Sequence, residues 1–163
     1  MNMKTPLASL LLPAAAIAMR LAPAAALLPV VPEGPDATAI PLIRAAAAGD
    51  DAEVRALLVR GDVDVDVRDE MENTPLHWAG YGSHVSTVDT LLTRGADIHA
   101  ANRSGATPLH EASKWGSAAV VAALIDAGAN VQAEDVREWT PRDVAAHHKN
   151  DAAATVLDSA WTN

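Results

Sequence analysis

The stretch TPLHWAGYGSHVSTVDTLLTRGAD, residues 74–97, returns 33 residues later as TPLHEASKWGSAAVVAALIDAGAN, residues 107–130. Thr140-Pro141 opens a third copy at the same interval. A fixed period of this length is typical of stacked-repeat arrays, in which no unit has enough apolar surface to fold alone. The sequence therefore predicts a stack of units that share one continuous core.

Local signals divide each copy into two helices. Thr74 and Thr107 are good N-cap residues, and the proline that follows each lacks the N–H that would go unpaired in the first turn. Gly95 and Gly128 follow the second helix, where a residue at positive φ ends a helix at little cost. Apolar residues recur at helical spacing on the inward faces of the first copy, at Leu76, Ala79, Val88, Leu91 and Leu92.

The pattern TPLH…A followed by LL..GA(D/N) resembles the ankyrin repeat. Residues 42–61 resemble the same unit without TPLH, as an N-terminal capping repeat would, and Arg142-Asp143 replaces Leu-His in the last unit, as a C-terminal cap requires. The resemblance implies an all-α solenoid of about four helix-turn-helix repeats with hairpin fingers. The repeats are predicted at residues 41–68, 69–101, 102–134 and 135–160. In this family the TPLH histidine, here His77 and His110, hydrogen-bonds locally and to the neighbouring repeat.

The segment GDVDVDV, residues 61–67, has acids at the first three ligand positions of a calcium loop. Position six of such a loop needs glycine and position twelve a bidentate glutamate, but this chain has Val67 and Asn73 there. The alternation instead favours an extended finger with its valines on one side and its aspartates toward water. One extra residue, relative to the next finger, is expected within this connection.

The N-terminus is interpreted separately. Residues 1–26 combine Lys4, an apolar run and several Ala-rich cleavage patterns, which is the layout of a secretory signal peptide. An uncleaved membrane anchor and a disordered Ala/Pro tail are the alternatives. Residues 27–40 are rich in proline and are expected to form a linker. We therefore expect a periplasmic or secreted protein of bacterial type, with no membrane contact once the signal is removed.

Composition and motifs limit the classes of function that the chain can have. The formal charge of −9 becomes −11 without the signal, because 10 basic residues then face 21 acidic ones, and such a surface repels nucleic acid. There is no cysteine, no phosphate-binding loop and no nucleophile elbow, so neither an enzyme nor a cofactor is predicted. The alternative is a metal-dependent or enzymatic protein that uses Asp143, His147 and His148, because Asp143 and His147 are spaced as metal ligands on a helix.

The family usually binds partners through a concave groove lined by finger tips and first helices. Tyr81, Trp115 and Trp139, three of the five aromatic residues, align with this groove and are predicted to anchor a partner. The alternative is that Trp115 and Trp139 pack on each other. Trp78 is interpreted as packing, and Trp161 is expected to close the C-terminal cap. The predicted partner-binding residues are Met71, Asn73, Tyr81, Arg103, Lys114, Trp115, Arg137, Trp139, His147 and His148.

The sequence thus predicts a monomeric, non-catalytic module that binds one partner protein with a basic and apolar surface. By analogy with small exported ankyrin proteins, the partner is a toxin or lytic enzyme to be neutralised, or a stress enzyme such as a catalase to be supported. A cytosolic interaction protein is a further alternative.

Overall fold

The computed structural model describes residues 41–61 and 63–161, and the predicted signal peptide and linker lie outside this part of the chain. The described residues form helices and turns, without a regular strand. The helices are α1 (Pro41–Ala48), α2 (Asp51–Arg60), α3 (Pro75–Tyr81), α4 (Val85–Thr93), α5 (Pro108–Trp115), α6 (Ala118–Asp126), α7 (Pro141–His147) and α8 (Asp151–Trp161).

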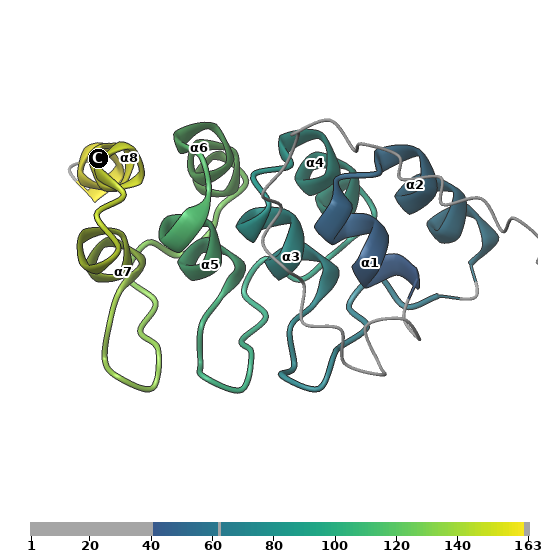
Figure 1. The fold of residues 1–163 in the computed structure, drawn as a ribbon, viewed down its shortest axis with the longest axis horizontal. Helices are drawn as coiled ribbons and strands as arrows, with labels where there is room; N and C mark the ends of the chain where they lie inside the picture. The colour runs from purple at the N-terminus through teal and green to yellow at the C-terminus, as the bar shows by residue number, and fades with distance from the viewer. Residues whose placement is uncertain (1–40, 62, 162–163) are drawn as a thin grey trace, which may run out of the picture.

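These helices form two layers that run the length of the molecule (Figure 1). The inner layer holds α1, α3, α5 and α7 side by side, and the outer layer holds α2, α4, α6 and α8. Three loops project from the inner layer: finger 1 (residues 63–73), finger 2 (residues 96–106) and finger 3 (residues 129–139). The predicted all-α solenoid of four stacked helix pairs is confirmed.

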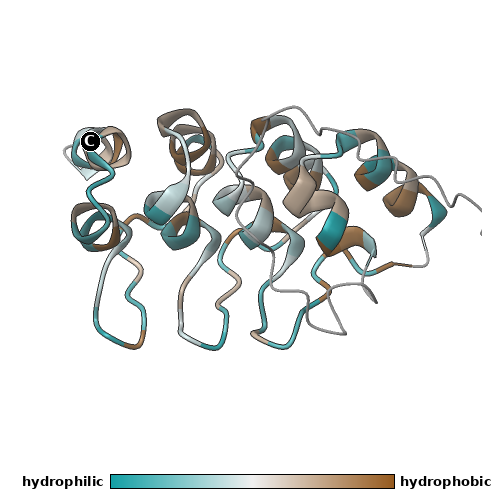
Figure 2. Cartoon of the chain, viewed as in Figure 1, coloured by the Kyte–Doolittle hydropathy of each residue, from teal (hydrophilic) through white to brown (hydrophobic). Residues whose placement is uncertain are grey.

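The core runs continuously between the two layers. Leu76, Ala79, Val88 and Leu91 are fully buried, as the helical spacing predicts. The outer helix α6, rich in alanine and valine, is coloured hydrophobic over most of its length, while hydrophilic stretches run along the fingers (Figure 2). Each unit thus gives its apolar faces to its neighbours and its polar loops to water.

The predicted helix boundaries follow from the local signals. Thr74, Thr107 and Thr140 are the N-cap residues of α3, α5 and α7, each followed by proline. Gly95 and Gly128 have φ values of 88° and 97°, the positive values expected after a second helix. These predictions are confirmed. They could be made from the sequence because each depends only on the few residues around a helix end.

The C-terminal cap differs from the expectation in one respect. Arg142, in the place of the TPLH leucine, is exposed and its Nε lies 2.8 Å from Asp158 Oδ1 on α8. Trp161, however, keeps 54 % of its surface exposed, so it does not close the end of the array as predicted. Ala153 and Leu157 instead supply the buried surface of α8. Trp161 continues the same four-residue spacing, but it is the last residue of the helix.

Candidate binding groove

One acidic or amide side chain organises each finger tip. Asp69, Asn102 and Asp135 recur at intervals of 33 residues, and the Oδ1 atom of each accepts backbone N–H groups two and four residues further on. This side chain closes the turn by satisfying donors that the finger cannot pair internally. The sequence prediction missed this role, although the spacing of the three residues could have revealed it.

The fingers are joined to one another through the backbone. The N–H of Arg103 in finger 2 donates to the Met71 carbonyl in finger 1 at 3.0 Å, and Val136 in finger 3 donates to Ser104 in finger 2 at 3.0 Å. Arg68 adds a side-chain bond of 2.8 Å to the Ala101 carbonyl. The three tips therefore form one joined surface along the groove.

Finger 1 is not the extended arm that the alternating sequence predicts. A turn closes between Asp64 and Val67, with an N–H to carbonyl distance of 3.2 Å. The Asp66 carboxylate does not face only water, because it accepts the Asp97 N–H of the next repeat at 3.0 and 3.2 Å. Val63, Val65 and Val67 are partly buried against the core, as expected. The remaining acid of the motif, Asp62, lies outside the described residues.

The two TPLH histidines tie consecutive repeats together. The backbone N–H of Thr74 donates to His77 Nδ1 at 3.1 Å, so this nitrogen is an acceptor and the proton lies on Nε2. Nε2 then donates to the Ala106 carbonyl of the next finger at 3.0 Å. His110 repeats the arrangement with Thr107 and with the Trp139 carbonyl, at 3.1 and 3.0 Å. The local and inter-repeat bonds that the resemblance implied are confirmed.

Burial keeps both histidines neutral. It lowers the pKa of His77 to about 4, against a partial offset from the bond to the Ala106 carbonyl. Burial also lowers the pKa of His110 below its ordinary value. His77 is therefore neutral near pH 7, and both rings act as fixed links between repeats behind the groove.

The ten predicted partner-binding residues lie in two pockets, at one finger tip and in one aromatic cluster. Met71, Asn73 and Tyr81 line a pocket between the second and third repeats. Lys114 and Arg137 line a second pocket between the third and fourth repeats, of about 340 Å³. Arg103 is exposed at the tip of finger 2. The remaining four, which form the aromatic cluster described next, are Trp115, Trp139, His147 and His148.

This aromatic cluster is a chain of ring contacts at the C-terminal end. Trp115 contacts His148 with ring centroids 5.1 Å apart, and Trp139 contacts His147 at 4.7 Å. The two histidine rings meet edge to face at 5.1 Å. The histidines thus stand between the indoles, and Trp115 is still 55 % exposed. Each tryptophan packs on a histidine, which was not among the predicted arrangements.

Arg137 and Asp135 fix the position of Trp139. The Arg137 guanidinium lies 4.3 Å from the Trp139 ring centroid and binds Asp135 Oδ2 at 2.6 and 2.9 Å. Burial alone would raise the pKa of Asp135, but the Arg137 guanidinium and the N–H groups of Arg137 and Trp139 outweigh it and hold the pKa below its ordinary value. The charge of Arg137 is therefore largely committed within the finger.

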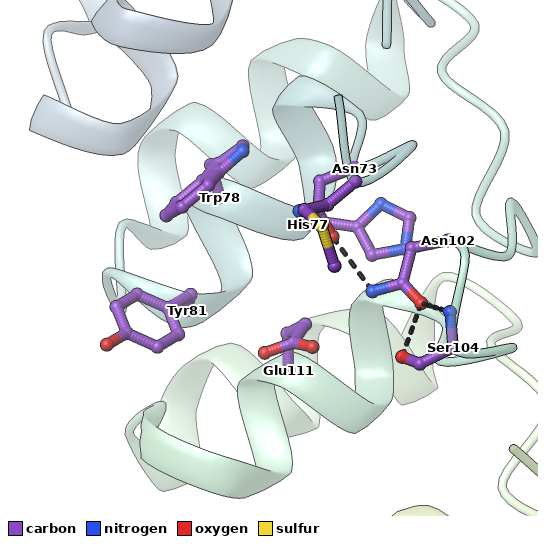
Figure 3. A pocket seen from close by; sticks show the side chains of 8 residues that line it. Asn73, His77, Trp78, Tyr81, Asn102, Ser104 and Glu111 are labelled. Atoms are coloured by element: carbon purple, nitrogen blue, oxygen red, sulfur yellow. Dashed lines mark hydrogen bonds between the residues drawn. The ribbon is translucent and has the colours of Figure 1, made fainter. Parts of the chain in front are cut away.

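The pocket between the second and third repeats has a volume of about 230 Å³ (Figure 3). Besides the three predicted residues, its lining includes Trp78 and Glu111. These two occupy the same repeat position, directly after the TPLH histidine, 33 residues apart. Trp78 was interpreted as packing, yet it lines the groove, and its Nε1 donates to Asp69 Oδ2 at 2.9 Å. The rest of the lining is His77, Asn102 and Ser104.

Glu111 lies between the two groove pockets and lines both. It is half-buried, and burial raises the pKa of its carboxyl above the ordinary value. The neighbouring Lys114 ammonium and the Asn102 side-chain amide offset part of this effect. A carboxylate placed in this way is stabilised when a positive charge binds beside it.

The alternative metal site is not assembled. The Asp143 carboxylate caps α7, accepting the Thr140 N–H at 2.9 Å and the Thr140 hydroxyl at 2.6 Å. His147 and His148 contact tryptophan rings instead. Within residues 41–61 and 63–161, no three His, Asp or Glu side chains converge as metal ligands would. The same part of the chain contains no helix with the length and hydropathy needed to cross a bilayer.

Comparison with known proteins supports this architecture. A family model described as ankyrin repeats (3 copies) matches residues 14–102 and 84–160. Ankyrin repeat domain-containing protein 49 of Homo sapiens is 49 % identical over 47 residues, which are 29 % of this chain and 20 % of that protein. Oxysterol-binding protein-related protein 1 of Rattus norvegicus is 45 % identical over 64 residues, which are 39 % of this chain and 7 % of that protein.

The matched segments therefore span a fifth or less of these relatives. Ankyrin repeats in general are non-enzymatic modules that bind other proteins. With two overlapping family matches across most of its length and the fold to accompany them, the chain belongs to the ankyrin-repeat family.

Proposed function

We propose that this protein is a non-catalytic module that holds one partner protein in its groove. The observation that carries the proposal is the location of exposed large hydrophobic residues. Three of the five exposed large hydrophobic residues in the described part of the chain, Met71, Trp115 and Val136, lie on the fingers or at the end of α5 and are 55 %, 55 % and 72 % exposed. The other two, Val59 and Trp161, lie on the outer helices α2 and α8. Exposed apolar area of this kind, rimmed by polar groups, marks interaction sites.

The groove is also preorganised. The fingers are joined by backbone bonds, and the rings of Trp139, His147, His148 and Trp115 support one another. A surface already held in place loses little conformational entropy when it binds. Its scarce aromatic residues are of the type that dominates binding energy at protein interfaces.

We extend the proposal to location and role. The signal-like sequence of residues 1–26 supports export to the periplasm or beyond, with the mature protein acting as a monomer. The partner is a protein with basic and apolar surface, since the chain is acidic. Neutralisation of a toxin or lytic enzyme, and support of a stress enzyme such as a catalase, are the roles we propose by analogy.

The test compares three baits in affinity capture from an envelope fraction of the native host. The baits are the wild-type protein, a Tyr81→Ala/Trp115→Ala/Trp139→Ala variant and a Trp161→Ala variant. Trp161 is the matched control, because it is as exposed as Trp115 but lies off the groove, at the end of α8. We expect one protein to bind the wild type and the control and to be lost by the groove variant.

All three baits must first melt cooperatively, so that loss of binding does not report unfolding. Equal capture by the groove variant and the wild type would refute groove binding. Export has its own test, which is N-terminal sequencing of the protein isolated from its host. A mature N-terminus close to residue 27 is expected, and an intact Met1 would exclude cleavage.

A further inference from the structure

The pocket between the second and third repeats combines a carboxylate with aromatic walls. Its lining joins Glu111 from α5, Trp78 and Tyr81 from α3, and Met71 from finger 1. In Figure 3 the Glu111 carboxylate lies between Tyr81 on one side and Asn102 and Ser104 on the other. Aromatic faces and an ionised carboxylate both attract cations, and here they meet in one cavity.

Glu111 has no cationic partner of its own in the pocket. Four ion pairs occur within the described part of the chain, and their acids are Asp51, Glu72, Asp135 and Asp158. Lys114 and Arg137 line the neighbouring pocket and lower the pKa of Glu111, but neither forms an ion pair with it, and Arg137 is already bound to Asp135. A half-buried carboxylate without an ion-pair partner is complementary to a cation supplied from outside.

The aromatic wall is held in place. Trp78 Nε1 is fixed to Asp69 Oδ2 at 2.9 Å, and the Trp78 and Tyr81 rings meet edge to face with centroids 5.9 Å apart. The amides on the opposite wall are fixed too, because Asn102 Nδ2 donates to Asn73 Oδ1 at 2.8 Å. The cavity therefore keeps its shape without a ligand, at a volume of about 230 Å³.

We propose that this pocket is a subsite for one arginine side chain of the partner, stacked on the Trp78–Tyr81 wall and paired with the Glu111 carboxylate. A guanidinium is planar, presents two parallel N–H groups to a carboxylate and stacks on aromatic rings, whereas an ammonium is a compact, strongly hydrated point charge. The inference rests on the proposed function, since it names the chemistry of one contact in the groove.

The test titrates the protein with N-acetyl-arginine methylamide and follows the tryptophan indole N–H signals by NMR. Trp78→Phe identifies the Trp78 signal. We expect saturable binding with a Kd of about millimolar order, as befits a small fragment. N-acetyl-citrulline methylamide has nearly the same shape without the charge, and we expect it to leave the Trp78 signal unmoved. Equal binding of citrulline would overturn the proposal.

Two protein variants test whether Glu111 supplies the negative charge that binds arginine. Glu111→Gln keeps the side-chain shape, and we expect it to weaken arginine binding about tenfold. Asp126→Asn is the matched control, since Asp126 is an exposed acid at the end of α6, in the outer layer. We expect it to leave the Kd unchanged. If Glu111→Gln leaves both the Kd and the unfolding midpoint unaltered, the Glu111 carboxylate does not contribute to arginine binding.

The corresponding lysine derivative tests whether the pocket prefers a guanidinium to an ammonium group. If it binds as tightly as the arginine derivative, the assignment to a guanidinium is overturned. This experiment is independent of the partner. Arginine binding together with equal capture by the wild-type and groove-variant baits would show that the pocket recognises arginine and would refute groove binding of a partner protein. Selective capture without arginine binding would refute the subsite alone.

Discussion

Nε2 of His77 lies 3.0 Å from the carbonyl oxygen of Ala106, so the second repeat is bonded directly to the finger of the third. Nδ1 of the same histidine accepts the Thr74 N–H, and this second bond requires a neutral ring. A proton on Nδ1 would place two donors against each other in a buried site. The stack is therefore expected to weaken in acid.

The pH dependence of stability follows from this geometry. The pKa of His77 is about 4 in the folded chain and about 6.5 in the unfolded chain, so between these values the unfolded state binds more protons. The free energy of unfolding should therefore fall as the pH drops from 6.5 towards 4, by about 3 kcal/mol from His77. His110 acts in the same direction, while the raised pKa of Glu111 opposes it.

Urea unfolding at pH 7.5 and 4.5 measures this effect. His99→Gln is the control, because His99 is exposed in finger 2, and it should leave the difference between the two pH values unchanged. His77→Gln should lower stability at pH 7.5 and flatten the pH dependence. Equal midpoints for the wild type at both pH values would contradict the role assigned to the buried histidines.

Thr87 and Thr90 on α4 make a matched pair. Both are buried, but the Thr87 hydroxyl has no hydrogen-bond partner within the described residues, whereas Thr90 Oγ1 donates to Asp51 Oδ1 at 2.6 Å. Thr87→Val keeps the side-chain shape and removes an unpaired polar group, so it should stabilise the protein by about 1 kcal/mol. Thr90→Val should destabilise it by about 1–2 kcal/mol. Thermal or urea unfolding decides, and a loss of stability in Thr87→Val would contradict the prediction.

Equivalent backbone positions in fingers 2 and 3 hold different residues. Gly105 has a φ of 73°, and its equivalent in finger 3, Glu138, has a φ of 62°. Glu138→Gly should stabilise the protein by about 0.5 kcal/mol, since relief of the left-handed strain exceeds the added chain entropy. Gly105→Ala should destabilise it by more than about 1 kcal/mol, because a Cβ there would also lie 3.0 Å from the Val136 nitrogen. Denaturation curves of both variants should therefore shift in opposite directions.

The buried carboxylate of Asp135 can be tested by graded replacement. Asp135→Ala leaves the N–H groups of Arg137 and Trp139 without their acceptor, and should cost about 2–3 kcal/mol of unfolding free energy. Asp135→Asn keeps that acceptor, as Asn102 does in finger 2, and loses only the ion pair with Arg137. We expect it to cost about 1 kcal/mol. Equal losses in the two variants would show that the ion pair, and not the turn, dominates.

Local signals were sufficient to predict the fold. The 33-residue period, the Thr-Pro pairs and the glycines after the second helices all act over a few residues, so each could be interpreted without knowing its neighbours in space. The repeat supplied the remaining information, because identical units can bury their apolar faces only by stacking. The two histidine links between repeats were also predicted, though through the resemblance and not from spacing.

The groove could be predicted only in part. Alignment of repeats placed Tyr81 and Trp115 in the groove, but Trp78 was assigned to packing and Glu111 was not among the predicted binding residues. Which side chains meet depends on the register of one repeat against the next. Contacts such as Asn73 with Asn102 join residues 29 positions apart, and no local signal encodes them.

Short-range backbone preferences and a repeated apolar pattern thus set the repeat unit, its helix caps and its stacking. The chemistry of the groove came from the tertiary structure. It placed histidines between Trp115 and Trp139, used Asp66 to bind the next repeat, and left Glu111 beside an aromatic wall without an ion-pair partner. The reason is physical: burial, ring contacts and charge pairing depend on distances that exist only after the repeats have packed together.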